Sequence, residues 1–316
     1  MKTRIHSNLK NLTHPLVVDS PYIFIKGDNA SGKSAIVHSV EWALTGYVAD
    51  AAGRDIKSST YVDTLACGPS AEVEVVMDNG TRHTGKNPSG SNVIADAMSA
   101  LTGTSTALVS YMLEYGASYD GLPVDVTLDY PSWDHWVKVE GSVRAALRRI
   151  QKAASKALSK ARGDVRDAKI VLKYGELPGI REMLASALTA EAEAKSLKGA
   201  VDAAAFQWLQ RVAPHISPLL RFYFIGKEVR IGLNDPEAGP VPSGAELVEV
   251  AIHLSSATRD PATALYVLPD RAYDTERLAH LLRVLRTTPC LMAIVQSPID
   301  PHQDYALSKY WSVLEV

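Results

Sequence analysis

The chain of 316 residues has few of the groups on which disulfide-bonded, zinc-bound and membrane-bound proteins depend. Its two cysteines, Cys67 and Cys290, are too few for a disulfide scaffold or a cysteine-rich zinc module, and they indicate a reducing compartment. The nine histidines have no metal-ligand spacing. No apolar run approaches the roughly 20 residues of a membrane span, and the first residues lack the apolar stretch of a signal peptide. We therefore expect a cytoplasmic protein with no membrane partner.

An excess of charge of either sign is also missing, because 33 basic residues face 35 acidic ones and the formal net charge is −2. With 46% hydrophobic and 22% charged residues, the composition is that of a globular protein and excludes a disordered chain. It also excludes a protein that is basic throughout, such as a small nucleic-acid coat protein. A nucleic-acid site then requires that charge be segregated along the chain.

Three zones of different composition follow one another along the chain. Residues 1–137 and 214–316 mix short β-branched runs with turn residues, and each zone predicts a lobe of strands and helices. Residues 138–213 are rich in alanine, lysine, arginine and glutamate, and they predict two long helices. We expect an α/β fold built from N- and C-terminal lobes, with a helical insertion between them.

Each half of the insertion has a seam of apolar residues, which predicts an antiparallel coiled-coil hairpin with arms of about 45 Å. The first seam contains one four-residue stutter and consists of Val143, Leu147, Ile150, Ala154, Ala157, Ala161, Val165, Ala168 and Leu172. The second seam consists of Met183, Ala187, Ala190, Ala194, Leu197, Val201, Ala204 and Trp208. A break at Tyr174–Gly179 separates them. The alternative is that both helices lie against the lobes, but narrow alanine-rich seams favour a two-helix pair.

A glycine-rich loop at residues 27–34 carries the clearest chemical signal. It fits the pattern G-x-x-x-x-G-K-[ST], in which backbone N–H groups and the lysine bind phosphate and the hydroxyl binds Mg²⁺. A strand pattern at Tyr22–Ile25 precedes the loop and a helical pattern from Ile36 to Leu44 follows it, so a chance glycine turn is the weaker explanation. The predicted nucleotide-binding residues of the loop are Gly27, Asn29, Ala30, Ser31, Gly32, Lys33 and Ser34.

The loop and the residues before it resemble a known family. The segment from Arg4 to Leu16, the next strand and the loop are similar to the N-terminal lobe of the SMC, RecF and SbcC ATPases, which are ABC-class heads used in DNA repair and chromosome maintenance. The resemblance implies an ABC-type P-loop NTPase head assembled from two lobes, with an inserted antiparallel helical hairpin. It also implies that this head binds ATP, with Mg²⁺ held by Ser34 and by an acid of the C-terminal lobe.

Residues 242–247 are similar to the signature motif of the same family, which opens a helix. In the family, this motif of one head contacts the γ-phosphate held by another head, which implies a homodimer or a hetero-complex paired through its heads. The residues concerned are Ser243, Gly244, Ala245 and Glu246. Without the resemblance, Ser243 and Glu246 are also the two ends of a capping box at an ordinary helix start.

The positions that cleave ATP in the family depart from its pattern. The strand at 264–268 is followed by Pro-Asp-Arg instead of Asp-Glu, so Asp270 is the single acid there and is either the Mg²⁺ ligand or the catalytic acid. Gln296 follows the last strand, where the family has a switch histidine. No glutamine occurs in residues 1–150 to form a Q-loop, and Glu114 is its predicted substitute. These departures predict slow ATP hydrolysis or none.

The first helix of the insertion is strongly basic, since residues 144–173 hold ten basic and two acidic residues. A stripe of this kind suits the repeated phosphates of duplex DNA, while the alternatives are a solvated face or an acidic protein partner. The break at 174–179 has no C-x-x-C, which excludes the zinc hook of the SbcC group. The DNA-binding candidates are Arg144, Arg148, Lys152, Lys156 and Lys160.

The sequence therefore predicts an ATP-binding, SMC/RecF/SbcC-like protein that acts in DNA repair, recombination or DNA maintenance through nucleotide-dependent head pairing. Any DNA cleavage in such a system needs a separate nuclease or other partner subunit, because the chain shows no second catalytic constellation. The alternative is a non-hydrolysing structural or assembly protein, of cellular or viral origin, that retains the ABC ATPase fold. A P-loop kinase or GTPase is the weakest interpretation, because the base-specificity and lid motifs of those enzymes are missing.

Overall fold

The computed structural model describes residues 2–10, 12, 14–28, 30–49, 55–56, 59–116, 128–175, 178–236, 239–269, 273–298 and 309–316. The chain divides into two compact units. Unit 1 consists of Met1–Gly103, Ser217–Ile225 and Val229–Val316, and unit 2 of Thr104–Ile216 and Gly226–Glu228. Unit 1 is thus assembled from both ends of the chain. No helix among the described residues is long and apolar enough to cross a membrane.

A five-stranded sheet forms the centre of unit 1, in the order β13-β3-β12-β11-β8, and all its neighbouring strands are parallel. Its strands are β3 (Tyr22–Lys26), β8 (Ser91–Asn92), β11 (Ala264–Val267), β12 (Met292–Ser297) and β13 (Ser312–Glu315). The central strands are buried along nearly their whole length, as in parallel sheets covered on both faces. Because β3 lies between two C-terminal strands, the sheet requires both lobes.

The main helices of unit 1 are α1 (Lys33–Thr45), α3 (Val93–Thr102), α8 (Gly244–Thr258) and α9 (Thr275–Thr287). Three of them, α1, α3 and α9, each follow a strand of this sheet along the chain, and the fourth, α8, precedes β11. Helix α1 buries Ile36, Val40 and Leu44 in the same apolar cluster as residues of β3 and β12. It ends at Gly46, which caps the helix in the left-handed conformation (φ 75°) that glycine adopts without steric cost.

A second, antiparallel sheet completes the N-terminal lobe, with the order β2-β1-β6-β7. Its strands are β1 (Thr3–Ser7), β2 (Leu16–Val18), β6 (Val73–Val76) and β7 (Arg82–Thr84). Ile5 of β1 and Val75 of β6 join the apolar cluster around α1. Smaller elements are β4 (Val48–Ala49), β5 (Asp55–Ile56), α2 (Ser59–Asp63), and the pair β9 (Leu220–Ile225) and β10 (Glu228–Leu233).

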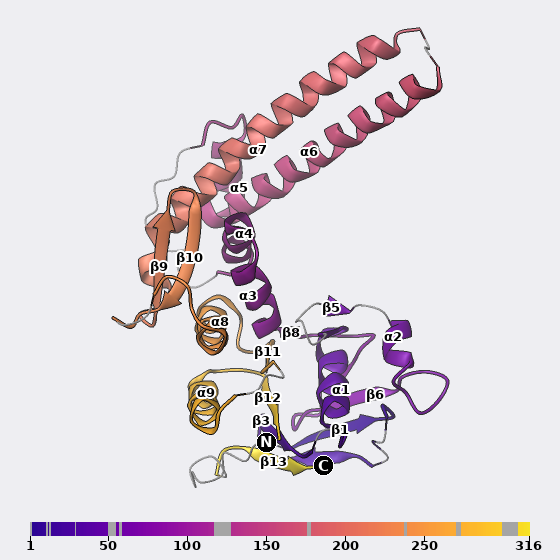
Figure 1. Ribbon diagram of the computed structural model, residues 1–316, viewed down its shortest axis with the longest axis vertical. Helices are drawn as coiled ribbons and strands as arrows, with labels where there is room; N and C mark the ends of the chain where they lie inside the picture. The colour runs from indigo at the N-terminus through magenta and orange to yellow at the C-terminus, as the bar shows by residue number, and fades with distance from the viewer. Residues whose placement is uncertain are drawn as a thin grey trace. The chain divides into compact units, whose positions relative to one another are not determined.

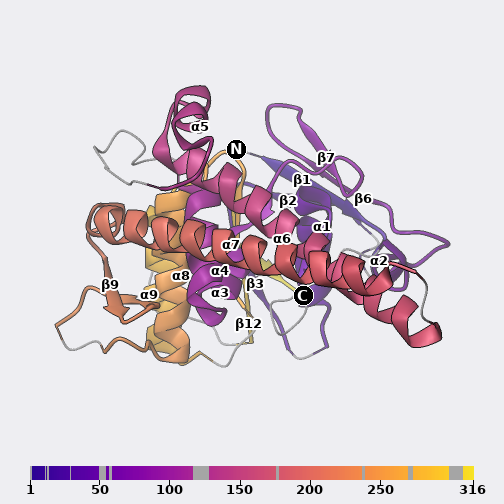
Figure 2. The ribbon, with the colours of Figure 1, turned by 90° about the horizontal axis from the view of Figure 1, so that it is seen from above.

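Unit 2 is helical and is dominated by two long antiparallel helices that run side by side (Figure 1, Figure 2). Its helices are α4 (Ser105–Tyr115), α5 (Trp133–Glu140), α6 (Val143–Tyr174) and α7 (Ile180–Ile216). Helices α4 and α5 both pack against α6. The sequence favours a left-handed glycine cap at Gly175, but this residue follows α6 with φ 158° and ψ 153°, which is not the left-handed conformation.

The seam between α6 and α7 differs from the prediction at four positions. On α6 the structure buries Leu158 and leaves Ala157 exposed, and Gln151 is buried as well. Ile150 is buried as predicted. Beside it, the covered positions of α6 form a heptad series without the stutter: Leu147, Gln151, Ala154, Leu158, Ala161, Val165, Ala168 and Leu172.

On α7, Met183 is 64% exposed, Ala190 is exposed, and the half-buried Leu184 and Glu191 take their places. Away from the seam, most side chains in the distal halves of both helices are exposed, which is the burial pattern of a two-helix pair. The predicted architecture is confirmed: an α/β fold assembled from N- and C-terminal segments, with an inserted antiparallel helical hairpin.

Candidate nucleotide site

The glycine-rich loop lies between β3 and α1, at the carboxyl edge of the parallel sheet. Ala30 and Gly32 both have positive φ (67° and 109°), and Gly32 is the N-cap of α1. These conformations turn the chain tightly into the helix, whose first N–H groups have no acceptor within the helix. Asn29 lies outside the described residues. The edge of a parallel sheet beside a helix N-terminus is a common place for phosphate binding.

Lys33 is the first residue of α1, and its side chain folds back over the loop. Its ammonium group donates hydrogen bonds to the carbonyl oxygens of Gly27, at 2.7 Å, and Asp28, at 2.6 Å. The residue is only 8% exposed. An ammonium group that is buried and held by the carbonyl oxygens of the loop is a fixed positive charge, and such a charge can bind a phosphate oxygen.

Gly27 is required by close packing. A Cβ atom at this position would lie 2.2 Å from the carbonyl oxygen of Val316 and 2.6 Å from the hydroxyl of Ser31. The backbone N–H of Val316 donates to the carbonyl oxygen of Lys26 at 3.0 Å, at the end of the β3–β13 pairing. The end of the β13 segment therefore packs against the first glycine of the loop and leaves no room for a side chain there.

Two hydroxyl groups of the loop bear on whether a nucleotide and Mg²⁺ fit here. The hydroxyl oxygen of Ser31 is buried and has no hydrogen-bond partner among the described residues. The hydroxyl of Ser34 donates to the amide oxygen of Gln296 at 3.4 Å. An orphaned hydroxyl, a fixed ammonium group and helix N–H groups together fit a polyphosphate, and Ser34 with Gln296 supplies oxygen ligands of the kind that Mg²⁺ prefers.

Gln296 is a further candidate site residue, although its place in the sequence indicates only the loss of a switch histidine. It lies in β12 opposite Ile25 of β3, so its side chain comes from the strand next to the loop. Its position at the end of a predicted strand was a signal in the sequence, because the residues that end neighbouring parallel strands meet at one edge of the sheet.

The predicted hydrolytic residues are less well defined. Asp270 lies outside the described residues, three positions after β11, which is the second strand from β3. Glu114 belongs to α4 of unit 2, where its carboxylate accepts a hydrogen bond from the ammonium group of Lys152 at 3.3 Å. The structure thus places Glu114 beside a residue of the basic stripe.

The signature-like residues form the N-terminus of α8. The backbone N–H of Ser243 donates to the carboxylate of Glu246 at 2.6 Å, and the N–H of Glu246 donates to the hydroxyl of Ser243 at 3.5 Å. These hydrogen bonds with Ser243 hold the pKa of Glu246 below its usual value. The capping box is therefore present. Ser243 and Gly244 are exposed and Ala245 is half-buried, so this helix end is open on the surface of unit 1.

Of the five DNA-binding candidates in the basic stripe of α6, four are exposed: Arg148, Lys152, Lys156 and Lys160. The fifth, Arg144, is half-buried. Lys152 is paired with Glu114, as described above. Farther along the helix, a hollow of about 500 Å³ is lined by four more basic residues, Arg162, Arg166, Lys169 and Lys173. Arg162 is paired there with Glu191 of α7 at 3.5 Å.

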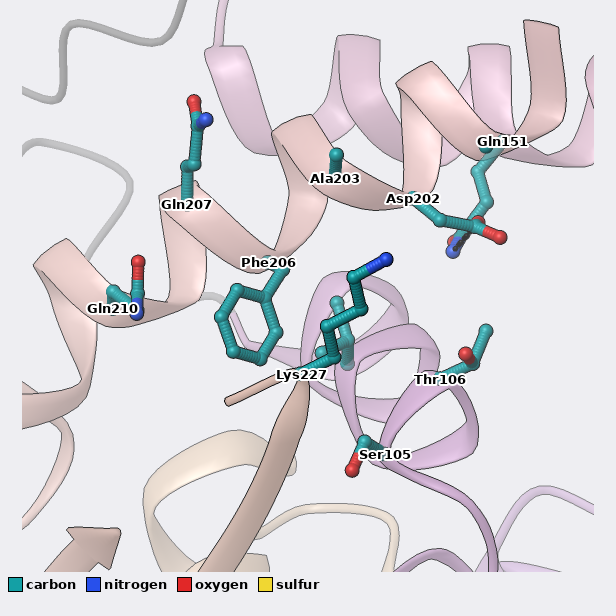
Figure 3. Close-up of a pocket in the computed structure, with 11 residues that line it drawn as sticks. Ser105, Thr106, Gln151, Asp202, Ala203, Phe206, Gln207, Gln210 and Lys227 are labelled. Carbon is teal, nitrogen blue, oxygen red and sulfur yellow. Dashed lines mark hydrogen bonds between the residues drawn. The ribbon is translucent and has the colours of Figure 1, made fainter. Parts of the chain in front are cut away.

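A separate pocket of about 390 Å³ lies within unit 2, between α4 and α7. The side chain of Lys227 extends into it between the ring of Phe206 and the carboxylate of Asp202 (Figure 3). Asp202 also receives hydrogen bonds from Gln151 and Lys198. None of the predicted site residues lines this pocket.

The fold, with its loop between β3 and α1 and its helical insertion, is similar to solved structures of an SMC head domain and of RecF. No protein-family model matches the chain, and no curated protein matches it. The SMC head domain of Pyrococcus furiosus, with an extended coiled coil and bound to the C-terminal domain of ScpA, is 15% identical, with 96% of this chain and 90% of that chain covered and a TM-score of 0.44. The recombination mediator RecF, solved with ATP, is 10% identical, with coverage of 95% and 92% and a TM-score of 0.44. At these values neither similarity bears on activity or partners.

Proposed function

We propose that unit 1 is a nucleotide-binding head that takes up ATP with Mg²⁺ in the loop at residues 27–34. The observation that carries this proposal is the juxtaposition of the fixed Lys33 ammonium group with the orphaned hydroxyl of Ser31. Lys33 and the N–H groups of α1 hold the outer phosphates, and Ser34 holds the metal ion. When bound, Mg²⁺ supplies positive charge to the phosphate oxygens.

The second part of the proposal is that two heads pair around the nucleotide. The N-terminus of α8 is exposed, and its capping box orients the hydroxyl and N–H groups of Ser243 and Gly244 at the positive end of the helix dipole. Such a surface suits a phosphate presented by another head, in a homodimer or in a hetero-complex. Pairing of this kind makes ATP the link between subunits.

We further propose that hydrolysis is slow. Gln296 stands where a proton-accepting histidine is implied, and an amide cannot accept a proton as an imidazole does. Asp270 is the single acid in the Pro-Asp-Arg segment that follows the strand at 264–268, so it cannot be both the metal ligand and the residue that positions water. The rival proposal is a structural or assembly protein that holds nucleotide without turnover, which the same two residues favour.

Binding and turnover distinguish these functions. We would measure the affinity of the full chain for ATP with Mg²⁺, its mass by light scattering with and without ATP, and its steady-state ATPase rate with and without duplex DNA. DNA-stimulated turnover supports a DNA-maintenance ATPase, and tight binding without turnover supports the structural protein. Absence of ATP binding contradicts both.

Replacing Gln296 with alanine is expected to weaken binding of ATP mainly when Mg²⁺ is present. The substitution removes the amide oxygen that lies 3.4 Å from the hydroxyl of Ser34, so the metal ion loses an oxygen near its proposed ligand. We expect about a tenfold loss of affinity with Mg²⁺ and little change with EDTA, the loss expected for one missing hydrogen-bonding group near a charge. An equal loss in both conditions would place Gln296 outside the metal site. Gln207 of α7, an exposed glutamine of unit 2, offers the matched control.

The basic stripe of α6 is proposed to bind the backbone of duplex DNA. Arg148, Lys156 and Lys160 are its exposed members without an assigned partner among the described residues. Neutralising these three is expected to weaken DNA binding at low salt and to reduce the salt slope by about 0.9 for each DNA phosphate that is no longer neutralised. The control neutralises Arg181, Lys195 and Arg211 of α7, where basic and acidic residues are nearly balanced. Equal salt slopes of DNA binding for the two variants would contradict the proposal that α6 binds DNA.

A further inference from the structure

A buried charge cluster joins α8 to α9 within unit 1 and has no part in the loop site described above. Its centre is the carboxylate of Glu249, whose side chain is only 9% exposed. One oxygen of Glu249 accepts a hydrogen bond from the guanidinium of Arg277 at 2.8 Å. The other oxygen lies 2.9 Å from Nε2 of His280 and 3.7 Å from Nε2 of His253.

The cluster keeps Glu249 charged. Burial by itself raises the pKa of this carboxyl, but the hydrogen bonds from His253 and His280 and the positive charges of His280 and Arg277 outweigh it and lower the pKa to about 2. A charged carboxylate that is this buried depends on keeping its partners, because separation leaves an uncompensated charge. The bonds from Arg277 and His280 therefore constrain how α8 and α9 lie against each other.

Arg277 connects this cluster to both helix starts. Its backbone N–H donates to the carboxylate of Asp274 at 2.7 Å, which is the N-cap of α9. Its positive charge also contributes to the lowered pKa of Glu246, the capping-box residue one turn before Glu249 on α8. Arg277 thus caps the start of α9 through its backbone, and its guanidinium binds Glu249 of α8, three residues after the capping-box residue Glu246.

We infer that Glu249 and Arg277 are positioning residues that hold the N-terminus of α8 in the orientation needed for head pairing; this inference rests on the pairing proposed above. Apolar packing between α8 and α9 sets their separation but not their rotation, because it has no preferred direction. A charge-assisted hydrogen bond has a fixed geometry. The Glu249–Arg277 contact therefore fixes where Ser243 and Gly244 point, although neither residue of the pair touches the nucleotide.

The test compares two isosteric substitutions, each of which removes the acid of an ion pair made with α8 or its C-cap. Glu249→Gln removes the charge beside Arg277. Asp96→Asn removes the charge beside Arg259, the C-cap of α8, whose Nη2 lies 2.9 Å from the Asp96 carboxylate. For each variant we would measure thermal unfolding, binding of ATP with Mg²⁺, and ATP-dependent pairing by light scattering. Glu249→Gln is expected to weaken pairing by about tenfold, the effect of removing one charged hydrogen bond, with ATP affinity unchanged. Asp96→Asn is expected to lower thermal stability but to pair normally.

Normal pairing of Glu249→Gln, or equal losses in both variants, overturns the positioning role. If Glu249→Gln does not fold, Arg277→Lys takes its place, because lysine keeps the charge but loses the planar fork of donors. Weaker pairing of Arg277→Lys supports the inference, and normal pairing overturns it. A wild-type chain that binds ATP and never pairs overturns the pairing proposal itself, and the inference with it, whatever the variants do.

Discussion

Replacing Lys33 with alanine is expected to lower the affinity for ATP by at least about 100-fold, or about 2.7 kcal/mol. The Lys33 ammonium group is buried and fixed by two loop carbonyl oxygens, so its charge is already in place before a phosphate arrives. Alanine removes this charge together with both hydrogen bonds and leaves the carbonyl oxygens of Gly27 and Asp28 turned toward an anion. Isothermal titration calorimetry with ATP and Mg²⁺ measures the loss directly.

The matched control is Lys26→Ala. Lys26 ends β3 immediately before the loop, and it is paired with the exposed Glu315 of β13 at 3.8 Å. This surface ion pair contributes little to stability. We expect wild-type affinity for Lys26→Ala. Equal affinities for the two variants would show that phosphate is not bound at Lys33, and a circular dichroism spectrum of each variant shows whether the fold is retained.

Replacing Trp208 with alanine is expected to lower the free energy of unfolding of unit 2 by about 3–5 kcal/mol. Trp208 lies in the seam of α7, is 2% exposed, and is the largest fully buried side chain of the described residues. A buried indole that is truncated to a methyl group leaves a cavity that the surrounding structure refills only in part. Urea unfolding followed by far-UV circular dichroism measures the change.

The same substitution at Trp136 of α5 provides the comparison. Trp136 is half-buried, and its ring is covered by the guanidinium of Arg149 at 3.6 Å. Loss of this stacking is expected to cost about 1 kcal/mol, because the cation–π contact is partly exposed to water. A cost for Trp208→Ala no larger than that for Trp136→Ala would mean that the α6–α7 seam is not the stabilising core of the hairpin.

The seam also shows where periodicity in the sequence fails. On α6, Ala157 and Leu158 are adjacent in a helix full of alanine, and a helical wheel drawn at 3.6 residues per turn assigned the wrong one. Two helices that pack along their length follow a 3.5-residue repeat, and that repeat selects Leu158. Met183 and Leu184 on α7 differ in the same way. The hairpin itself was predictable, but its register was not.

In the candidate site, too, local features could be predicted from the sequence and long-range contacts could not. The loop residues could be named from spacing alone, because G-x-x-x-x-G-K-[ST] reflects backbone geometry within eight consecutive residues. The contact of Ser34 with Gln296 joins positions 262 residues apart, and no local pattern predicts it. The pairing of Glu114 with Lys152, and of Glu249 with Arg277, likewise depends on which helix faces lie together.

The near-neutral composition, the strand–loop–helix order and the basic middle helix were determined by the sequence, since each is a property of neighbouring residues. Only the tertiary structure decided that β3 lies between β12 and β13, that Gln296 reaches Ser34, and that Glu249 of α8 meets Arg277 of α9. The physical reason is that sheet order and the pairing of buried charges arise from packing segments distant in the chain, where burial fixes which polar groups must meet.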